Sequence, residues 1–300
     1  MTPAAVTATS THRRSAKESH AKMPAPVGAA PAIRRILLVS VWIVTAVIII
    51  APLIAIFTQA LSAGLGAYFG NLLEPATRHA IFLTVLTALV VVPINIGFGL
   101  AAAWTVSKFN FRGRSFLITL IDLPYSISPI VAGVAYLFVY GAQGLLGPWL
   151  AEAGIKIMFS LPAIFLASMF VTAPFVAREL IPLMQVQGND EEEAALSLGA
   201  SGWRTFQRVT LPNVRWALFY GAILCNARVM GEFGAVSVVS GNIRGVTNTL
   251  PLQIELLYHD YNAAGAFAAA SVLTLVALLT IIARFVFERQ EESRVENPAL

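Results

Sequence analysis

Long apolar runs separated by short polar stretches are the feature that most limits what this chain can fold into. Six such runs lie near residues 36–58, 80–104, 115–139, 157–181, 214–239 and 264–287. Each can cross about 30 Å of hydrocarbon as a helix. Charged residues make up only 12% of the 300 positions, against roughly one quarter in soluble domains. The sequence therefore predicts an all-α integral membrane protein with about six transmembrane helices.

The basic residues of the short loops predict the orientation, since Lys and Arg beside a span tend to stay cytoplasmic. They gather before the first span, after the second and after the fourth: Arg13, Arg14, Lys17, Lys22, Arg34 and Arg35; Lys108, Arg112 and Arg114; Arg178, Arg204, Arg208 and Arg215. The other loops hold chiefly Arg78, Lys156 and Arg244, each near an acidic residue. Both termini are therefore expected in the cytoplasm.

Three segments follow from this pattern. Residues 1–35 are rich in Ala, Thr, Pro, Ser and His without helical or strand periodicity, and are expected to form a disordered basic cytoplasmic tail. Residues 36–287 form one membrane domain, and 288–300 a cytoplasmic C-terminal tail. The sole cysteine, Cys225, excludes an intramolecular disulfide. No metal site and no nucleic-acid binding are expected, because His79 and His259 are far apart in outside loops and the basic residues are scattered.

The segment 189–212, between the fourth and fifth predicted spans, carries the strongest local signals. Asp190 is placed to cap a helix, and the glutamates at 191–193 lie in its positively polarised first turn. Glu193 is at the reach-back position of a capping box. Gly199 can take the left-handed conformation that ends such a helix. A short cytoplasmic helix is therefore predicted here.

A second short helix is expected to start near Ser201, with Trp203 and Phe206 on one face. That face is apolar and is predicted to lie in the cytoplasm. An exposed aromatic anchor between two spans suits docking into a partner's groove, because the anchor gains by leaving water. Pro212 then suits the first turn of the fifth span.

The residues Glu193-Ala194-Ala195, Gly199, Val209 and Leu211-Pro212 resemble, in their spacing, the EAA loop of bacterial ABC importer permeases. The resemblance implies a type I (MetI-like) importer fold and a coupling helix held in a cleft of a nucleotide-binding subunit. The residues expected to couple to that ATPase are Glu193, Ala194, Ala195, Gly199, Trp203, Phe206, Leu211 and Pro212. The alternative is an interfacial helix lying on the headgroups, although lysines would suit anionic headgroups better than these acids.

The chain contains no Gly-x-x-x-x-Gly-Lys-Ser/Thr loop of the kind that cradles nucleotide phosphates. It is therefore expected to be no enzyme and to hold no cofactor of its own, with ATP and Mg²⁺ bound by a partner ATPase. An ion-gradient-driven secondary transporter is the alternative from a different class. It would favour paired half-repeats, and the sequence shows none.

Four further stretches are similar to the W-type subunits of sulfate/thiosulfate permeases: DLPYSISPIVAG (122–133), VARELIP (176–182), ARVMGEFGAVSVVSGNIRG (227–245) and LPLQIELLY (250–258). The resemblance implies an inner-membrane, multi-pass subunit working with a T-type sister permease, two ATP-binding-cassette ATPase subunits and a periplasmic sulfate-binding protein. The implied cargo is sulfate or thiosulfate. Molybdate permeases share the Gly-Glu-Phe-Gly-Ala element more loosely, so another oxyanion is the alternative.

Candidate pathway residues are Ser126, Ser128, Arg228 and Glu232. Arg228 and Glu232 are four residues apart within a span, so they can meet on one helix face. Either Arg228 attracts an anion, or the two form a structural ion pair.

In the third span, Pro124 and Pro129 each remove a backbone donor, and the serines add hydroxyls. A broken helix along the pathway and an ordinary kink are both compatible with this pattern. Asp122 at this depth needs a partner or water, and Asn95 in the second span is expected to join helices.

Overall fold

The computed structural model describes residues 31–296, with side chains from Ile33 to Phe285, and every element in this range is a helix. The chain divides into two units, Met1–Pro52 and Leu53–Leu300. The tail predicted over residues 1–35 lies outside the described residues as far as residue 30, and residues 31–35 are already helical.

The described part of the first unit is one apolar helical stretch. It holds α1 (Pro31–Thr45), a π-helical turn (Ala46–Ile50) and the start of α2 (Ala51–Leu61). The helix Ile33–Leu61 is long and apolar enough to cross a membrane. Its large apolar side chains are exposed around the helix, as for Trp42 at 73%. An all-round apolar, exposed helix is typical of a span whose solvent is lipid.

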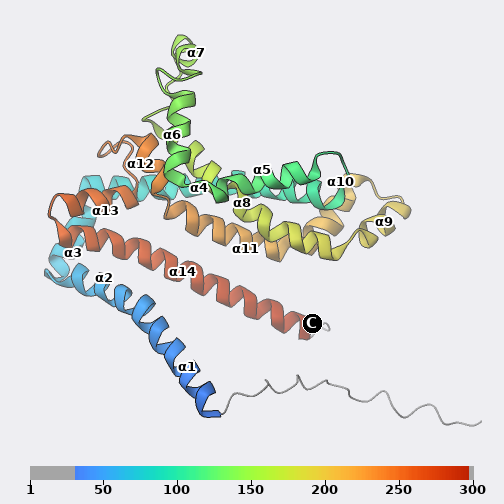
Figure 1. The fold of residues 1–300 in the computed structure, drawn as a ribbon, viewed down its shortest axis with the longest axis horizontal. Coiled ribbons are helices and arrows are strands. Elements are labelled where there is room, and N and C mark those ends of the chain that lie inside the picture. Colours follow the sequence, from blue (N-terminus) through green and yellow to red (C-terminus); the bar gives the residue numbers. More distant parts are fainter. Residues whose placement is uncertain (1–30, 297–300) are drawn as a thin grey trace, which may run out of the picture. The chain divides into compact units, whose positions relative to one another are not determined.

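The second unit is built on three long helices that run alongside one another: α4 (Pro75–Lys108), α8 (Leu161–Gln187) and α11 (Leu211–Met230) (Figure 1). Their shared core includes Val91, Val176, Leu180, Val214 and Cys225. The helices approach closely at Val176, because a Cβ at Gly99 would lie 2.6 Å from Val176 Cβ and one at Gly221 would lie 3.2 Å from Val176 Cα. Small residues on both neighbours thus allow α8 to pack between them.

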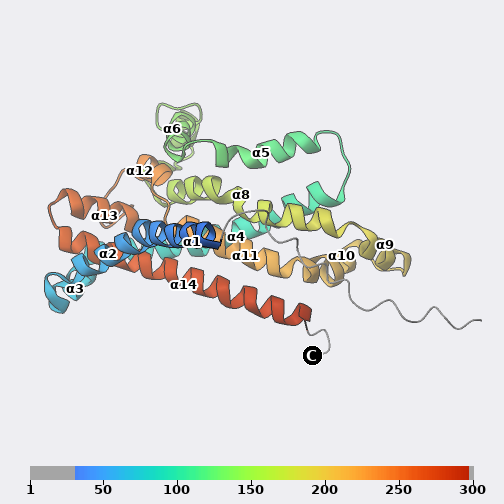
Figure 2. The same ribbon diagram turned by 60° about the horizontal axis from the view of Figure 1, so that its bottom comes forward.

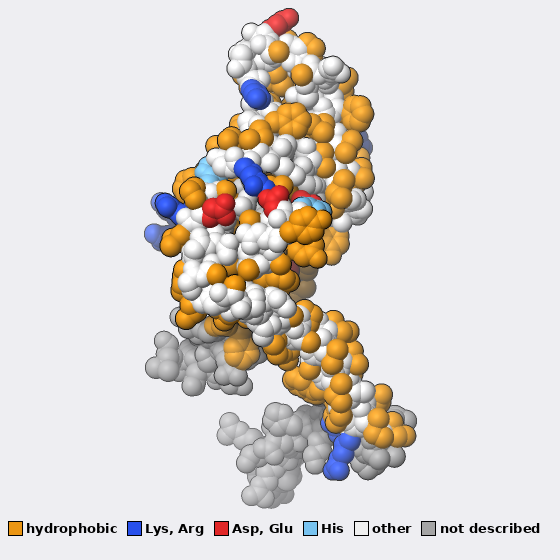
Figure 3. Space-filling view, turned by 90° about the vertical axis from the view of Figure 1, so that its left-hand side faces the viewer, with side chains coloured by type: hydrophobic (Ala, Val, Ile, Leu, Met, Phe, Trp, Pro, Cys, Tyr) orange, Lys and Arg blue, Asp and Glu red, His pale blue; other side chains and the backbone are white. Residues whose placement is uncertain are grey.

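The remaining long helices flank this core. Helix α3 (Gly64–Leu73) and α13 (Leu250–His259) pack against α14 (Ala263–Glu296). The bounds of α14 mean that the helix continues through most of the predicted C-terminal tail, as far as Glu296. Figure 3 shows hydrophobic side chains over much of the visible face, with charged groups confined to a few places. Such a surface is expected for a protein in a bilayer.

Two of the predicted crossings are broken. Helix α5 (Arg114–Ser126) and α6 (Pro129–Tyr140) meet at 107°, so 115–139 is not one straight crossing (Figure 2). Pro129 has no N–H to continue α5, and Ile127 and Ser128 ahead of it are extended, with ψ of 138° and 131°. The fifth span bends by 50° between α11 and α12 (Gly234–Ser240). The model thus has four continuous candidate spans, or up to six counting each bent pair as one.

Several positions differ from the loop assignments of the sequence. Arg178 lies inside α8 and Arg215 inside α11, where loops after the fourth span were expected. His79 belongs to the second turn of α4, and His259 ends α13. Arg178 and Arg215 fall inside the apolar windows 157–181 and 214–239, so counting them with the loop was wrong, whereas His79 lies in a part of α4 that precedes its window.

Asn95 joins helices as predicted. It is 2% exposed, and its Nδ2 donates to Thr172 Oγ1 at 2.7 Å and to the carbonyl of Met169 at 3.3 Å. Both partners belong to α8. The amide thereby fixes α4 against α8 where Pro93 removes a backbone donor from α4.

Candidate functional site

The loop between α8 and α11 begins with α9 (Asp190–Ser197). Asn189, not Asp190, occupies the N-cap, and its side chain makes no capping hydrogen bond. The predicted cap was therefore misplaced by one residue. The acidic residues of the first turn still face the positive end of the helix, and two of them bind other helices instead of the cap.

Gly199 ends α9 as its position predicts. Its φ is +86°, in the left-handed region that favours glycine. The N–H of Ala200 donates to the carbonyl of Ala195 at 3.0 Å, and that of Gly199 to Leu196 at 2.9 Å. This pair of bonds is the Schellman arrangement, which satisfies carbonyls left open at the helix end. The turn directs the chain into the second helix.

The second helix of the loop, α10 (Gly202–Thr205), is capped by Ser201, whose Oγ accepts the N–H of Arg204 at 3.4 Å. It continues without interruption through a π-helical turn, η2 (Phe206–Thr210), into α11. Pro212 is the second residue of α11 and lies in its first turn as predicted, although the continuous helix already begins at Gly202. The π turn before Pro212 shifts the hydrogen-bond register where the proline ring would meet a carbonyl.

The loop is held to two long helices by polar contacts that the sequence did not predict. Lys108, the last residue of α4, lies 2.7 Å from the carboxylate of Glu192, and the two side chains are only 7% and 16% exposed. Thr210 Oγ1 donates to the same carboxylate at 3.1 Å, and Asn213 Nδ2 donates to Glu191. The spacing of residues 108 and 192 does not predict a contact between them. From the sequence, Lys108 indicated only that the loop after the second span is cytoplasmic.

An aromatic group forms the exposed tip of this loop. The rings of Trp203 and Phe206 stack at 5.5 Å with 19° between their planes, and Phe206 reaches Trp104 of α4 at 4.9 Å. Trp203 is 66% exposed and Leu198 is 89% exposed. A groove of about 370 Å³ lies beside them, lined by Trp104, Leu196 and Phe206 among others. The tip combines an apolar surface with a rigid attachment.

The predicted coupling residues come together in this loop. Glu193, Ala194, Gly199, Trp203 and Pro212 are exposed; Ala195, Phe206 and Leu211 are half-buried. The predicted pathway residues Arg228 and Glu232 lie at the other end of α11, about 25 Å along the helix from Leu211. The structure thus separates the two groups by most of a membrane thickness.

Arg228 and Glu232 form an ion pair, as their spacing allows, with 2.7 Å between Nη1 and Oε2. The Oε2 contact is not aligned as a hydrogen bond. Glu232 is only 1% exposed in its side chain, and its Oε1 accepts the N–H of Ala235 at 3.0 Å. This carboxylate therefore satisfies the first turn of α12 just after the break in the fifth span.

A second ion pair lies beside the break between α5 and α6. Arg178 Nε is 3.1 Å from Asp122 Oδ1, and the side chains are 47% and 39% exposed. The guanidinium also covers the ring of Tyr125 at 4.4 Å. Ser126 and Ser128 at the break are exposed, and Ser126 Oγ donates to the carbonyl of Asp122 at 3.5 Å. Asp122 thus has the partner its depth requires, although Arg178 was not predicted as that partner.

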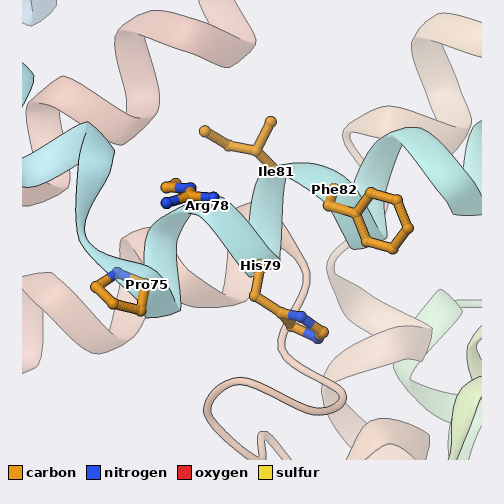
Figure 4. A pocket seen from close by; sticks show the side chains of 5 residues that line it. All are labelled: Pro75, Arg78, His79, Ile81 and Phe82. Atoms are coloured by element: carbon orange, nitrogen blue, oxygen red, sulfur yellow. The ribbon is translucent and has the colours of Figure 1, made fainter.

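An open pocket of about 590 Å³ lies at the start of α4. Its lining residues Arg78 and His79 leave the helix on different sides (Figure 4). His79 Nε2 lies 3.3 Å from the carbonyl of Val246. Because the polar groups do not converge, this pocket lacks the arrangement of a binding or catalytic centre.

Comparisons with known proteins agree with this architecture. The structure matches a bacterial ABC transporter involved in the import of the acidic polysaccharide alginate, with a TM-score of 0.72 and 14% identity over 86% of this chain and 96% of that one. The same fold appears in the alginate transporter in complex with its alginate pentasaccharide-bound periplasmic protein, also at a TM-score of 0.72 and with 15% identity.

Sequence relatives are much closer. The chain is 55% identical over 252 residues to the sulfate transport system permease protein CysW of Escherichia coli (strain K12), covering 84% of this chain and 87% of that protein. It is 46% identical over 243 residues to CysW of Synechocystis sp., covering 81% and 88%. It is 36% identical to CysT of Escherichia coli over 79% of this chain and 88% of that protein. A family model matches residues 95–292. With that match, the chain belongs to the binding-protein-dependent transport system inner membrane components.

Proposed function

We propose that this chain is the membrane-spanning permease subunit of an ATP-driven importer that moves sulfate or thiosulfate across the inner membrane. The observation that carries the proposal is the loop of α9 and α10, whose exposed aromatic tip is fixed to α4 and α11 by Lys108, Thr210 and Asn213. A tip that binds a moving partner transmits motion only if its attachment to the spans is stiff. The identity to sulfate permease relatives supports the cargo.

In this proposal the tip docks in a cleft of an ATP-binding-cassette ATPase, on the cytoplasmic side. Trp203 and Leu198 are the anchors, because they are the large apolar side chains that gain most by leaving water. ATP and Mg²⁺ bind to the ATPase pair, and closure of that pair draws the loops together. Both ends of the chain then lie in the cytoplasm.

Three further partners complete the assembly. The names of the relatives include both W and T permeases, which supports pairing of this chain with a T-type sister subunit. The family description supports a separate binding protein, here one for sulfate in the periplasm. Two ATPase subunits then serve two permease loops. Alternating access of the paired permeases moves the cargo released by the binding protein.

The assembly is tested by reconstituting the chain with these partners in proteoliposomes and measuring uptake of radiolabelled sulfate, thiosulfate and molybdate. We expect ATP-dependent uptake of sulfate that stops when the ATPase is left out. Uptake without the ATPase would contradict the proposal, and uptake of molybdate alone would contradict the cargo.

The side of the loop is tested with a single added thiol. Cys225 is fully buried, so the wild-type chain gives a low background for labelling. Ser197→Cys, at the exposed end of α9, should react with an impermeant maleimide in inside-out vesicles and not in right-side-out vesicles. The reverse result would place the loop outside and remove its contact with an ATPase.

A further inference from the structure

We propose that Arg178 binds the oxyanion as it crosses the membrane, and that Asp122 holds the guanidinium when no cargo is present. This inference rests on the proposed function and names a residue for it. Arg178 and Asp122 are 47% and 39% exposed, and both lie inside helices of candidate spans. Charged groups at such a depth avoid lipid, because exposing a charge to hydrocarbon is energetically costly. The face that carries them must therefore meet water or another protein.

The break between α5 and α6 gives a second reason to place this face away from lipid. Helix α5 has 13 residues, about 20 Å, so it ends part-way across the hydrocarbon. Ser126 and Ser128 at the break are exposed. Irregular backbone at membrane depth is tolerated only where it is buried in protein or lines a water-filled cavity. The ring of Tyr125, under the guanidinium of Arg178, connects the break to the ion pair.

The guanidinium of Arg178 is available to a ligand. The nearest contact of its ion pair runs from Nε to Asp122, and over residues 33–285 its two terminal amino groups make no hydrogen bond. A planar guanidinium binds tetrahedral oxyanions through two parallel N–H donors. A half-exposed ion pair contributes little to stability. An incoming dianion can therefore displace Asp122 at little energetic cost.

Arg228, the arginine first considered for this task, is less suitable. Its partner Glu232 is buried, and the same carboxylate binds the N–H of Ala235 at the start of α12. A ligand that displaced Glu232 would leave a buried carboxylate without its countercharge, which is strongly destabilising. The partner of Arg178, Asp122, is half-exposed, so its displacement leaves no buried charge unpaired.

The test compares Arg178→Gln with Arg178→Lys and with Arg244→Gln as a matched control. Arg244 also forms a half-exposed pair, with Asp260, away from the break. We expect Arg178→Gln to lower the rate of sulfate uptake at least 10-fold while ATP hydrolysis stimulated by the loaded binding protein stays within about twofold. Arg178→Lys should retain an intermediate rate, and Arg244→Gln the wild-type rate. Normal uptake by Arg178→Gln, or equal loss of uptake and of stimulated hydrolysis, would overturn the assignment.

A second measurement does not depend on the arginine variants folding. Ser126→Cys is tested for reaction with a charged methanethiosulfonate reagent in the assembled transporter, with the buried Cys225 as background. Reaction that slows when cargo-loaded binding protein and ATP are added supports a water-filled pathway at the break. Absence of reaction in every nucleotide state overturns the proposal. Failure of the wild-type complex to import sulfate would instead refute the proposed function itself.

Discussion

The loop at α9 and the break between α5 and α6 use ion pairs in opposite ways. At the loop, Lys108 and Glu192 are almost fully enclosed, and Glu192 also accepts a hydrogen bond from Thr210. At the break, Arg178 and Asp122 are half open, and the arginine rests on an aromatic face. The enclosed pair fixes two helices to each other, whereas the open pair can exchange one partner for another. The difference in burial therefore separates a structural contact from one that is free to change.

The largest expected effect tests the enclosed pair. Lys108→Met leaves Glu192 buried without a cation, which costs about 3–5 kcal/mol. We expect a clear fall in the thermal unfolding midpoint of the detergent-solubilised chain, measured by fluorescence-detected size exclusion. Combining Lys108→Met with Glu192→Leu should recover much of the loss. If Lys108→Met alone is as stable as the wild type, the pair is not enclosed.

The next effect concerns the tip that this pair supports. Trp203→Ala removes the exposed anchor, and loss of such a residue weakens association by about 2–4 kcal/mol, or roughly 30-fold to nearly 1,000-fold. Binding of the purified ATPase to permease in nanodiscs measures it. Trp149→Ala is the control, since Trp149 of α7 (Gly147–Glu152) is also highly exposed, at 74%. If both variants bind equally well, the tip is not the docking surface.

Substitution of Gly199, in the turn between α9 and α10, is expected to have a smaller effect on stability and a large effect on transport. Gly199→Asp places a side chain at a φ of +86°, at a cost of about 1–2 kcal/mol, and a Cβ there meets no other atom within 4 Å. We expect the spans to remain in the membrane while ATPase attachment weakens and uptake is lost. Gly202→Ala, which lacks a positive φ and also has open space, should retain uptake. Retained uptake in Gly199→Asp would argue against a role for the turn in coupling.

The smallest expected change concerns the half-exposed ion pair of Arg178 and Asp122. Asp122→Asn removes a half-exposed charge, so the unfolding midpoint should shift by an amount equivalent to less than about 1 kcal/mol. The same unfolding assay used for Lys108→Met gives a direct contrast between the pairs. A loss as large as that of Lys108→Met would mean that the pair at the break also holds the fold together.

Features encoded within a short stretch of sequence were predictable. Hydropathy located the continuous spans, because about 20 apolar residues in a row leave few alternatives. The position of Gly199 predicted its left-handed turn, and the spacing of Trp203 and Phe206 predicted their shared face. In each case the signal and the structure lie within one or two helical turns.

Features that depend on tertiary packing were not predictable. The pairing of Lys108 with Glu192, and of Asp122 with Arg178, joins residues more than 50 positions apart. The prolines predicted a break between α5 and α6 but not its angle of 107°, because a proline indicates where a helix stops and not the direction of the next helix. The π turn that joins α10 to α11 ahead of Pro212 was not predicted either, because it leaves no pattern in the residues.

The uninterrupted helix from Gly202 to Met230 has a mechanical consequence. It is about 43 Å long, and it packs against Val176 of α8 at Gly221, between its two ends. When a helix rotates as a rigid body about a contact between its ends, the two ends move in opposite directions. Movement of Trp203 toward the pathway axis would therefore move Arg228 away from that axis. Closing the pathway at the end near Trp203 would then open it at the end near Arg228.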